Sequence, residues 1–331
     1  MRKIFPEKLK IGDEVRVIAP SLSMALISEE TRNIALRRFS DLGLHLSFGK
    51  NVLEKDDFLS SSIASRIEDF HAAFADKNVK AVITVIGGYN SNQLLKYLDW
   101  GLVAKNPKVF CGYSDITILN NAIFAKTGLV TYYGPHYSSF GQKLYFEYTL
   151  DYFKKCLIDE APFEVKPSEN WSDDPWYKNQ EERNLVRNDG WEIINNGSAG
   201  GTIIGGNLGT FGLLRGTEYF PETDKAILFL EDDEGAGELS DLEFDRNLQA
   251  LINLAWFKSV SGLVIGRFQK ASKMTADKLT KIIKTKKELV GMPVLADLDF
   301  GHTDPKITFP IGGEMDLTVQ DGKAKLEIIN H

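Results

Sequence analysis

A serine stands where a predicted buried strand gives way to a predicted helix. The strand is KVFCGYS (108–114) and the helix is DITILNNAIFAKTG (115–128). Ser114 is a candidate nucleophile, because a serine on a sharp strand-to-helix turn presents its hydroxyl outward. The alternative is that Ser114 caps the helix, with Asp115 in its first turn. The hydrolase motif G-x-S-x-G is not complete, since residue 116 is isoleucine, so both interpretations stay open.

A serine nucleophile needs a base, and the base needs a carboxylate to orient it. His302 is the best candidate base among the five histidines, because it lies in a loop, DFGHTDPKITFPIG (299–312), after an apolar run. A structural turn histidine is the alternative, and His136 is a second candidate for the cleft wall. Glu231 is the best candidate carboxylate. It directly follows the apolar run AILFL, where an unpaired charge would be costly.

The acids after that run also suggest a metal site. Asp232, Asp233 and Glu234 follow Glu231 directly. No His or Asn accompanies them at calcium-loop spacing, so they are expected to be solvated. The sequence therefore predicts neither a metal nor an organic cofactor.

A second strand end carries two adjacent glycines. The apolar run AVITVIGG (81–88) leads into the loop IGGYNSN (86–92), here called the glycine loop. Gly87 and Gly88 would bring backbone N–H groups close to a ligand, since no side chain intervenes. The following helix adds the positive end of its dipole. We therefore expect an anion or oxyanion site at this sheet edge, with Tyr89 and Asn90 beside the substrate.

The elements that must position these residues differ between the first and the later part of the chain. The first part of the chain alternates strand and helix signals, which predicts an α/β domain with a parallel sheet of the Rossmann or flavodoxin-like type. Strand signals dominate the later part, which predicts a mixed, barrel-like, β-rich domain with helices. We expect residues 1–160 to carry the nucleophile and residues 161–331 to carry the glutamate and histidine. The polar stretch 169–191, which lies near the start of the second domain and is here called the excursion, is typical of an irregular loop or lid.

The bulk composition excludes several classes of protein. The 331 residues carry a formal net charge of -7, which argues against binding a nucleic-acid polymer. Two cysteines cannot form a disulfide framework, and a reducing cytoplasm fits them. The N-terminal residues show no apolar stretch of signal-peptide length, and no apolar run is long enough to predict a membrane-spanning helix. We expect a cytoplasmic protein.

Six segments, in order, resemble the LD-carboxypeptidase family of serine peptidases. They are VRVIAPS (15–21), IGGYNSNQLLKYLDW (86–100), CGYSDIT (111–117), GGTIIGGNLGTFGLLRGT (200–217), LFLEDDE with FDRNLQAL (228–251) and GHTDPKITFPIG (301–312). The resemblance implies a triad of Ser114, Glu231 and His302 and an acyl-enzyme mechanism. It also implies a backbone oxyanion hole at Gly88 and Asp115, with Gly87 as the adjacent alternative, and a homodimer.

The glycine loop and the excursion are most similar to the family branch that contains the microcin C self-immunity peptidase. This branch hydrolyses the amide of aminoacyl-nucleotide compounds, whereas the murein-recycling branch more usually has Arg-Gly-Gly in place of Ile86-Gly-Gly. Murein tetrapeptides are therefore the alternative substrate, and a non-catalytic protein that holds a small anionic ligand is a third possibility. Four aromatic residues are candidate stacking surfaces for a nucleobase: Trp171, Trp176, Tyr177 and Trp191. Alternatively, they anchor the excursion or a dimer interface.

A carboxypeptidase must also recognise a carboxylate or its mimic. Arg246, Arg267 and Lys306 are candidates for this contact, and the sequence does not choose among them. A structural ion pair is the better interpretation of Arg246, which follows the acid cluster in a predicted helix.

Overall fold

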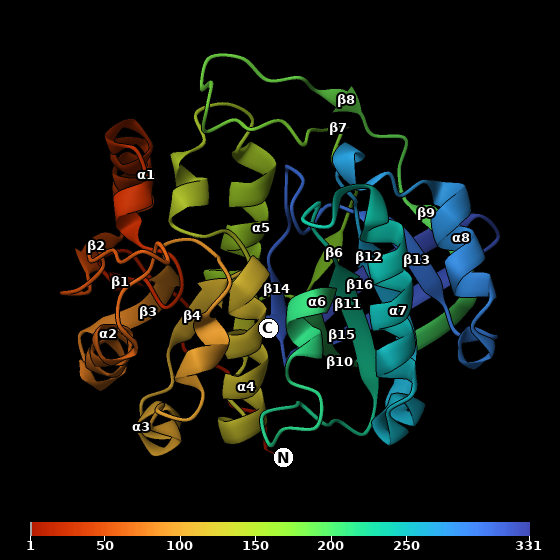
Figure 1. Cartoon of the computed structure of the whole chain (residues 1–331), viewed down its shortest axis with the longest axis horizontal. Helices are drawn as coiled ribbons and strands as arrows, with labels where there is room; N and C mark the ends of the chain where they lie inside the picture. The colour runs from red at the N-terminus through yellow and green to blue at the C-terminus, as the bar shows by residue number, and fades with distance from the viewer. Residues whose placement is uncertain (1) are drawn as a thin grey trace.

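Near-continuous apolar runs form the sheet of the N-terminal half in the computed structural model, which describes residues 2–331 (Figure 1). In β3 (Val79–Thr84) only Lys80 is exposed, as expected of a strand covered on both faces. The sheet has the order β14-β5-β4-β3-β1-β2 and is parallel except at β14. Its other strands are β1 (Glu14–Ile18), β2 (His45–Phe48), β4 (Val109–Gly112), β5 (Thr131–Tyr133) and β14 (Phe309–Ile311).

Capped helices connect these strands. Ser28 accepts a hydrogen bond from Thr31 N–H at the start of α1, and Ser62 does the same for Ser65 N–H at α2, so each satisfies an orphan helix donor. The helices of this half are α1 (Glu29–Asp41), α2 (Ile63–Ala75), α3 (Trp100–Lys105), α4 (Thr117–Thr127) and α5 (Glu147–Leu157). Short 3₁₀ helices, η1 (Met24–Leu26), η2 (Ser91–Leu94), η3 (Ser114–Ile116) and η4 (Ser138–Gly141), lie at loops and helix starts.

The C-terminal half is an open, mixed sheet of eight strands with helices. Its order is β6-β16-β15-β10-β11-β12-β13-β9, and the four strands β10 to β13 run parallel. The strands are β6 (Phe163–Val165), β9 (Glu192–Asn195), β10 (Gly197–Asn207), β11 (Ala226–Glu231), β12 (Val260–Gly266), β13 (Val294–Leu298), β15 (Glu314–Gln320) and β16 (Lys323–Asn330). The helices are α6 (Leu208–Gly212), α7 (Ser240–Ile252) and α8 (Ala276–Lys284), with η5 (Gly237–Leu239), η6 (Ala255–Ser259), η7 (Lys270–Ser272) and η8 (Lys287–Leu289) between them.

The expectation of an α/β chain with a β-rich second half is confirmed, but its barrel-like part is wrong. The strands β6 and β9 form opposite edges of the sheet and do not pair with each other. Buried parallel strands at the centre of a sheet need helices over their faces, and in Figure 1 α7 and α8 lie in front of this sheet. Strand patterns in the sequence do not show whether the two edge strands meet, which is why the expectation of a barrel-like sheet failed.

The two halves are joined by a returning strand and by buried amide contacts. β14 lies late in the chain but pairs antiparallel with β5, with Phe309 opposite Tyr133. Asn121 of α4 exchanges hydrogen bonds with the backbone of Gly205 in β10, at 2.7 Å to its carbonyl and 3.2 Å from its N–H. The buried apolar residues of both halves form a single core. Groups from the two halves can therefore be held in a fixed geometry.

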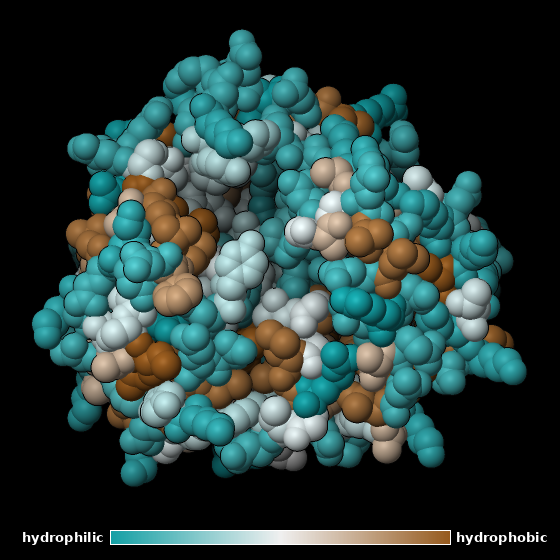
Figure 2. Space-filling model, in the orientation of Figure 1, coloured by the Kyte–Doolittle hydropathy of each residue, from teal (hydrophilic) through white to brown (hydrophobic). Residues whose placement is uncertain are grey.

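The excursion runs over the top of both halves in Figure 1, as the green segment bearing a small two-stranded sheet. This sheet pairs β7 (Asn170–Trp171) with β8 (Val186–Arg187). Figure 2 shows a hollow between the two halves on the same face. Across residues 2–331, helices of the length and apolar character needed to span a membrane are absent.

Candidate active site

Ser114 lies on a sharp turn between β4 and α4, in a conformation that side chains other than glycine seldom adopt. Its φ is +59°, in the left-handed region. Two glycines make room for this turn. A Cβ on Gly112 would lie 2.3 Å from Thr84 Oγ1, and a Cβ on Gly87 would lie 2.8 Å from Ser114 Cβ. The turn is therefore a nucleophile elbow in geometry, although the chain lacks the second glycine of the usual motif.

The three residues singled out from the sequence meet at the junction of the two halves. His302 Nε2 lies 3.0 Å from Ser114 Oγ, and His302 Nδ1 lies 2.8 Å from Glu231 Oε2. Glu231 is fully buried at the end of β11, whereas Ser114 and His302 are partly exposed. The histidine can thus contact both partners while the serine remains accessible to a substrate.

Tyr133 of β5 completes a ring of hydrogen bonds around these residues. Its hydroxyl donates to Glu231 Oε1 at 2.6 Å and accepts from Ser114 N–H at 3.4 Å. Burial and the adjacent carboxylate raise the pKa of this phenol well above its usual range, so the hydroxyl keeps its proton. Both oxygens of Glu231 therefore have a donor, one from each half of the chain.

Gly301 and Gly266 leave space for the buried carboxylate. A Cβ on Gly301, whose φ is +97°, would lie 2.7 Å from Glu231 Oε2, and a Cβ on Gly266 would lie 2.9 Å from Glu231 Cβ. The glycine before His302 thus lets the loop pass directly over Glu231.

The glycine loop faces Ser114 directly. A Cβ on Gly87 would lie 2.9 Å from Ser114 Oγ and 3.4 Å from Asp115 N. Gly88 has a φ of +149°, and a Cβ there would lie 2.3 Å from Ser21 Oγ. The absence of side chains on this loop leaves open the space next to the Ser114 hydroxyl and the Asp115 N–H.

The Asp115 side chain ties three strand ends together. Its Oδ2 accepts hydrogen bonds from Ser21 Oγ at 2.6 Å, Asn90 N–H at 3.0 Å and Ser91 N–H at 2.9 Å. Ser91 Oγ donates in turn to the Asp115 carbonyl at 2.8 Å. Asp115 is 3% exposed, so these bonds are shielded from water. One carboxylate therefore fixes the glycine loop relative to the serine turn, a role that sequence reasoning missed.

Two titrating groups at the site have shifted pKa values. Burial of His302 disfavours its charged form, but the Glu231 carboxylate more than offsets this, with help from Asp233, and the pKa of His302 is raised. Burial raises the pKa of Asp232 to about 7, and the adjacent Glu231 and Asp233 add to the shift. Asp232 is half-buried, in contrast to the solvated acid expected from the sequence.

His136 is buried, and its ring contacts Tyr113 and Thr84. Its ring stacks on Tyr113 with 4.2 Å between centroids, and its Nδ1 lies 2.9 Å from Thr84 Oγ1. Burial, together with the positive charges of His302 and Lys306, lowers the pKa of His136 well below its usual value. A neutral His136 therefore supports the residue that precedes the nucleophile.

The aromatic residues of the excursion differ in their surroundings. Trp171 has the Arg267 guanidinium at 5.1 Å and the Lys270 ammonium at 5.0 Å from its ring, both cation–π contacts. Trp176 is half-buried and meets the exposed Tyr177 edge to face. Cations already contact Trp171, whereas Trp176 lies at the surface of the excursion.

Trp191, Tyr89 and Asn90 also lie in different settings. Trp191 packs against the core just before β9. Tyr89, in the glycine loop, is 89% exposed. Asn90 Oδ1 accepts from Arg66 at 3.1 Å and from Ser21 Oγ at 3.3 Å, so its side chain serves the loop itself.

The three basic candidates for carboxylate recognition all have partners within the protein. Arg246 pairs with Glu243 on the exposed surface of α7 at 2.5 Å. Arg267 is buried and donates to Asn188 Oδ1 at 2.9 Å. Lys306 is buried and pairs with the carboxylate of Asp304.

Comparison with known families places the chain among peptidases. A model of the LD-carboxypeptidase N-terminal domain matches residues 15–134, and a model of the LD-carboxypeptidase C-terminal domain matches residues 200–317. The chain belongs to the LD-carboxypeptidase family. The first matched range includes Ser114 and the glycine loop, and the second includes Glu231 and His302.

Members of the LD-carboxypeptidase family from several bacteria resemble the whole chain. The Bacillus subtilis (strain 168) protein named "Putative carboxypeptidase YocD" is 48% identical and covers 99% of this chain and 100% of its own length. The crystal structure of an MccF-like protein from Bacillus anthracis str. Ames has a TM-score of 0.97 and 51% identity, over 99% of this chain and 100% of that one.

A third relative is the Microcin C7 self-immunity protein MccF of Escherichia coli, which is 30% identical over 92% of this chain and 90% of its own. Its structure in complex with aspartyl sulfamoyl adenosine has a TM-score of 0.86 at 29% identity, over 99% of each chain. MccF has also been solved with glutamyl sulfamoyl guanosine.

Proposed function

We propose that the protein is a serine carboxypeptidase or amidase in which Ser114 is the nucleophile, His302 the base and Glu231 the orienting carboxylate. The single observation that carries this proposal is the continuous contact from Ser114 Oγ to His302 at 3.0 Å and on to Glu231 at 2.8 Å. A capping serine has no need of this arrangement. The φ of +59° at Ser114 adds support, since strained backbone is concentrated at functional sites.

The reaction begins when Ser114 Oγ attacks the amide carbonyl carbon and its proton passes to His302 Nε2. The carbonyl oxygen becomes an oxyanion, which the N–H groups of Gly88 and Asp115 stabilise; each donor contributes about 3 kcal/mol in such sites. His302 then gives the proton to the leaving nitrogen as the C–N bond breaks. Water, deprotonated by His302, hydrolyses the resulting ester and restores Ser114. Glu231 stabilises the imidazolium in both stages.

The substrate class follows from the MccF relative. Because MccF holds both aspartyl sulfamoyl adenosine and glutamyl sulfamoyl guanosine, we infer that this chain acts on amides between an acidic amino acid and a purine nucleotide or its mimic. The exposed Tyr89 and the tryptophans of the excursion are the aromatic surfaces proposed to contact the base.

The test is a hydrolysis assay on three compounds: aspartyl sulfamoyl adenosine, glutamyl sulfamoyl guanosine and a murein tetrapeptide. Wild type is expected to cleave the two nucleotide compounds and to act weakly on the tetrapeptide. Preference for the tetrapeptide would instead assign the murein-recycling activity. Binding of all three without turnover would support a non-catalytic ligand-binding protein.

The family resemblance also predicts a homodimer. Light scattering on the purified full chain tests this, with a mass near twice 37.1 kDa expected and a mass near 37.1 kDa contradicting it.

A further inference from the structure

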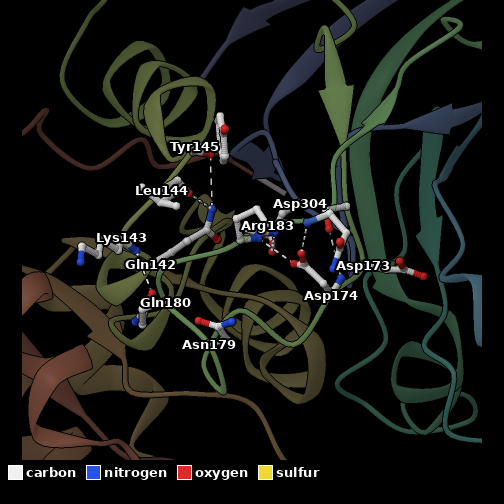
Figure 3. Close-up of polar contacts among 12 residues, drawn as sticks. Gln142, Lys143, Leu144, Tyr145, Asp173, Asp174, Asn179, Gln180, Arg183 and Asp304 are labelled. Atoms are coloured by element: carbon white, nitrogen blue, oxygen red, sulfur yellow. Dashed lines mark hydrogen bonds and ion pairs between the residues drawn. The ribbon is translucent and has the colours of Figure 1, made fainter.

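A buried arginine fastens the excursion to the loop that carries His302. The side chain of Arg183 is only 1% exposed, and its Nε donates to Asp174 Oδ1 at 2.6 Å. Its Nη2 lies 3.3 Å from Asp304 Oδ2. The backbones of Ser172 and Asp304 also exchange two hydrogen bonds, at 2.7 and 2.8 Å. Figure 3 shows Arg183 between the two carboxylates.

The middle of the excursion, at Gln180, is fastened to the N-terminal half. Gln180 Oε1 accepts from Lys143 N–H at 3.0 Å (Figure 3). The Gln180 Nε2 donates to the Gly141 carbonyl at 2.8 Å. This anchor is itself packed tightly on α1, since a Cβ on Gly141 would lie 2.2 Å from Thr31 Cγ2. The excursion therefore connects α1 and η4 with the His302 loop.

The fastened loop also contacts the nucleophile turn. Asp304 lies two residues after His302 and pairs with Lys306. Burial lowers the pKa of Lys306, but Asp304 more than offsets this, so the pKa is raised and the lysine stays charged. The Lys306 ammonium lies 5.3 Å from the centre of the Tyr113 ring, next to Ser114.

We propose that Arg183 and Gln180 are positioning residues, and that the excursion is a strap that holds His302 against Ser114 rather than a lid over an already complete site. The inference rests on the triad proposed above. Ser114 and His302 come from different halves of the chain, so their separation depends on what ties the halves together. A displacement of about 1 Å at such a contact costs on the order of 100-fold in rate.

The test is the second-order rate at which a fluorophosphonate labels Ser114. In this reaction the Ser114 Oγ–P bond forms, the P–F bond breaks with loss of fluoride, and His302 takes the serine proton. The probe is small and needs neither the nucleobase contacts nor the acidic side-chain contacts of a substrate. In variants that leave the oxyanion hole unchanged, its rate therefore reports the Ser114–His302 geometry. Rates are compared at a temperature at which circular dichroism shows each variant to be folded.

Arg183→Met is expected to slow labelling about 100-fold, and Gln180→Ala about 10-fold, because each releases the strap from one half of the chain. Arg183→Lys keeps one ion pair and is expected to recover part of the rate. The matched control is Glu181→Gln, which removes only the exposed ion pair with Lys143 in the same segment. Its rate should stay within about two-fold of wild type.

A purely structural role would lower the melting temperatures of Arg183→Met and Gln180→Ala but leave labelling of the folded protein at the wild-type rate, which would overturn the inference. If the excursion were a lid that limits entry of the probe, these variants would be labelled faster than wild type. That result would also contradict the inference. If Arg183→Met does not fold, Gln180→Ala decides. An unlabelled wild type would reject the triad itself, whereas labelled wild type with unaffected variants rejects only the strap.

Discussion

The Tyr133 hydroxyl, from the N-terminal half, donates a 2.6 Å hydrogen bond to the buried Glu231 carboxylate of the C-terminal half. The same carboxylate holds His302 through its other oxygen. The orientation of the imidazole therefore depends on a residue outside the predicted triad. Hydrogen bonds in such buried rings can strengthen one another, and removing a single donor leaves a carboxylate oxygen buried without a partner.

Tyr133→Phe is expected to reduce kcat about ten-fold, with little change in KM, because Glu231 is then free to turn away from His302. Stability should fall by about 1–3 kcal/mol, the cost of an unsatisfied buried acceptor. Steady-state kinetics and urea unfolding measure the two effects. Tyr132→Phe, on the adjacent buried residue of β5, is the matched control and should keep wild-type kcat. Equal kinetics in the two variants would contradict the role given to Tyr133.

Gly87→Ala is expected to abolish turnover. The added methyl group would lie 2.9 Å from Ser114 Oγ, in the space that the attacked carbonyl group needs. Gly209→Ala is the control, since a Cβ there meets its nearest neighbour at an ordinary 3.6 Å. Hydrolysis by Gly87→Ala within ten-fold of wild type would show that the substrate carbonyl does not lie between the glycine loop and Ser114.

Asp115→Asn is expected to lower kcat about 100-fold through the oxyanion hole. The amide replaces an acceptor that serves three donors, so the glycine loop shifts relative to the serine turn. Ser21→Ala removes only one of those donors and should have a smaller effect. Affinity for a transition-state analogue should fall in parallel with kcat, whereas affinity for a substrate analogue should not. Parallel loss of both affinities would indicate general damage to the site.

The pH dependence of kcat/KM should show an acid limb set by His302. The base must be neutral to accept the serine proton, and its pKa is raised in the folded protein. Activity should therefore be lost as pH falls through a value above the ordinary histidine pKa of about 6.5. Asp232, whose pKa is raised to about 7, is the other group that titrates in this range. The limb should persist in Asp232→Asn, and its disappearance there would assign it to the aspartate.

Much of the site could be predicted from the sequence because parallel strands gather their carboxyl ends at one edge. The turns at Gly88 and Ser114 follow closely on strands that apolar runs predict, β3 and β4. Glu231 follows from a charge placed directly after such a run. These signals are local, and the structure brings their residues together.

The signals that sequence reasoning missed depend on long-range pairing. Tyr132 and Tyr133 are adjacent in the run TYY of β5. Packing against β14 and β11, which lie far away in the chain, decides which of the two rings faces Glu231. Arg183 and Asp304 are 121 positions apart, so their pairing leaves no local pattern. The barrel-like expectation was wrong because strand patterns do not show whether the two edge strands meet.

The most direct measurement of the central claim is the mass of the peptide that contains Ser114 after reaction with a fluorophosphonate. The adduct is expected on Ser114 in wild type and should be lost in His302→Ala, because the serine then has no base. Hydrolysis of aspartyl sulfamoyl adenosine should also be lost in His302→Ala. Continued hydrolysis by Ser114→Ala, or an adduct at another residue, would contradict the account.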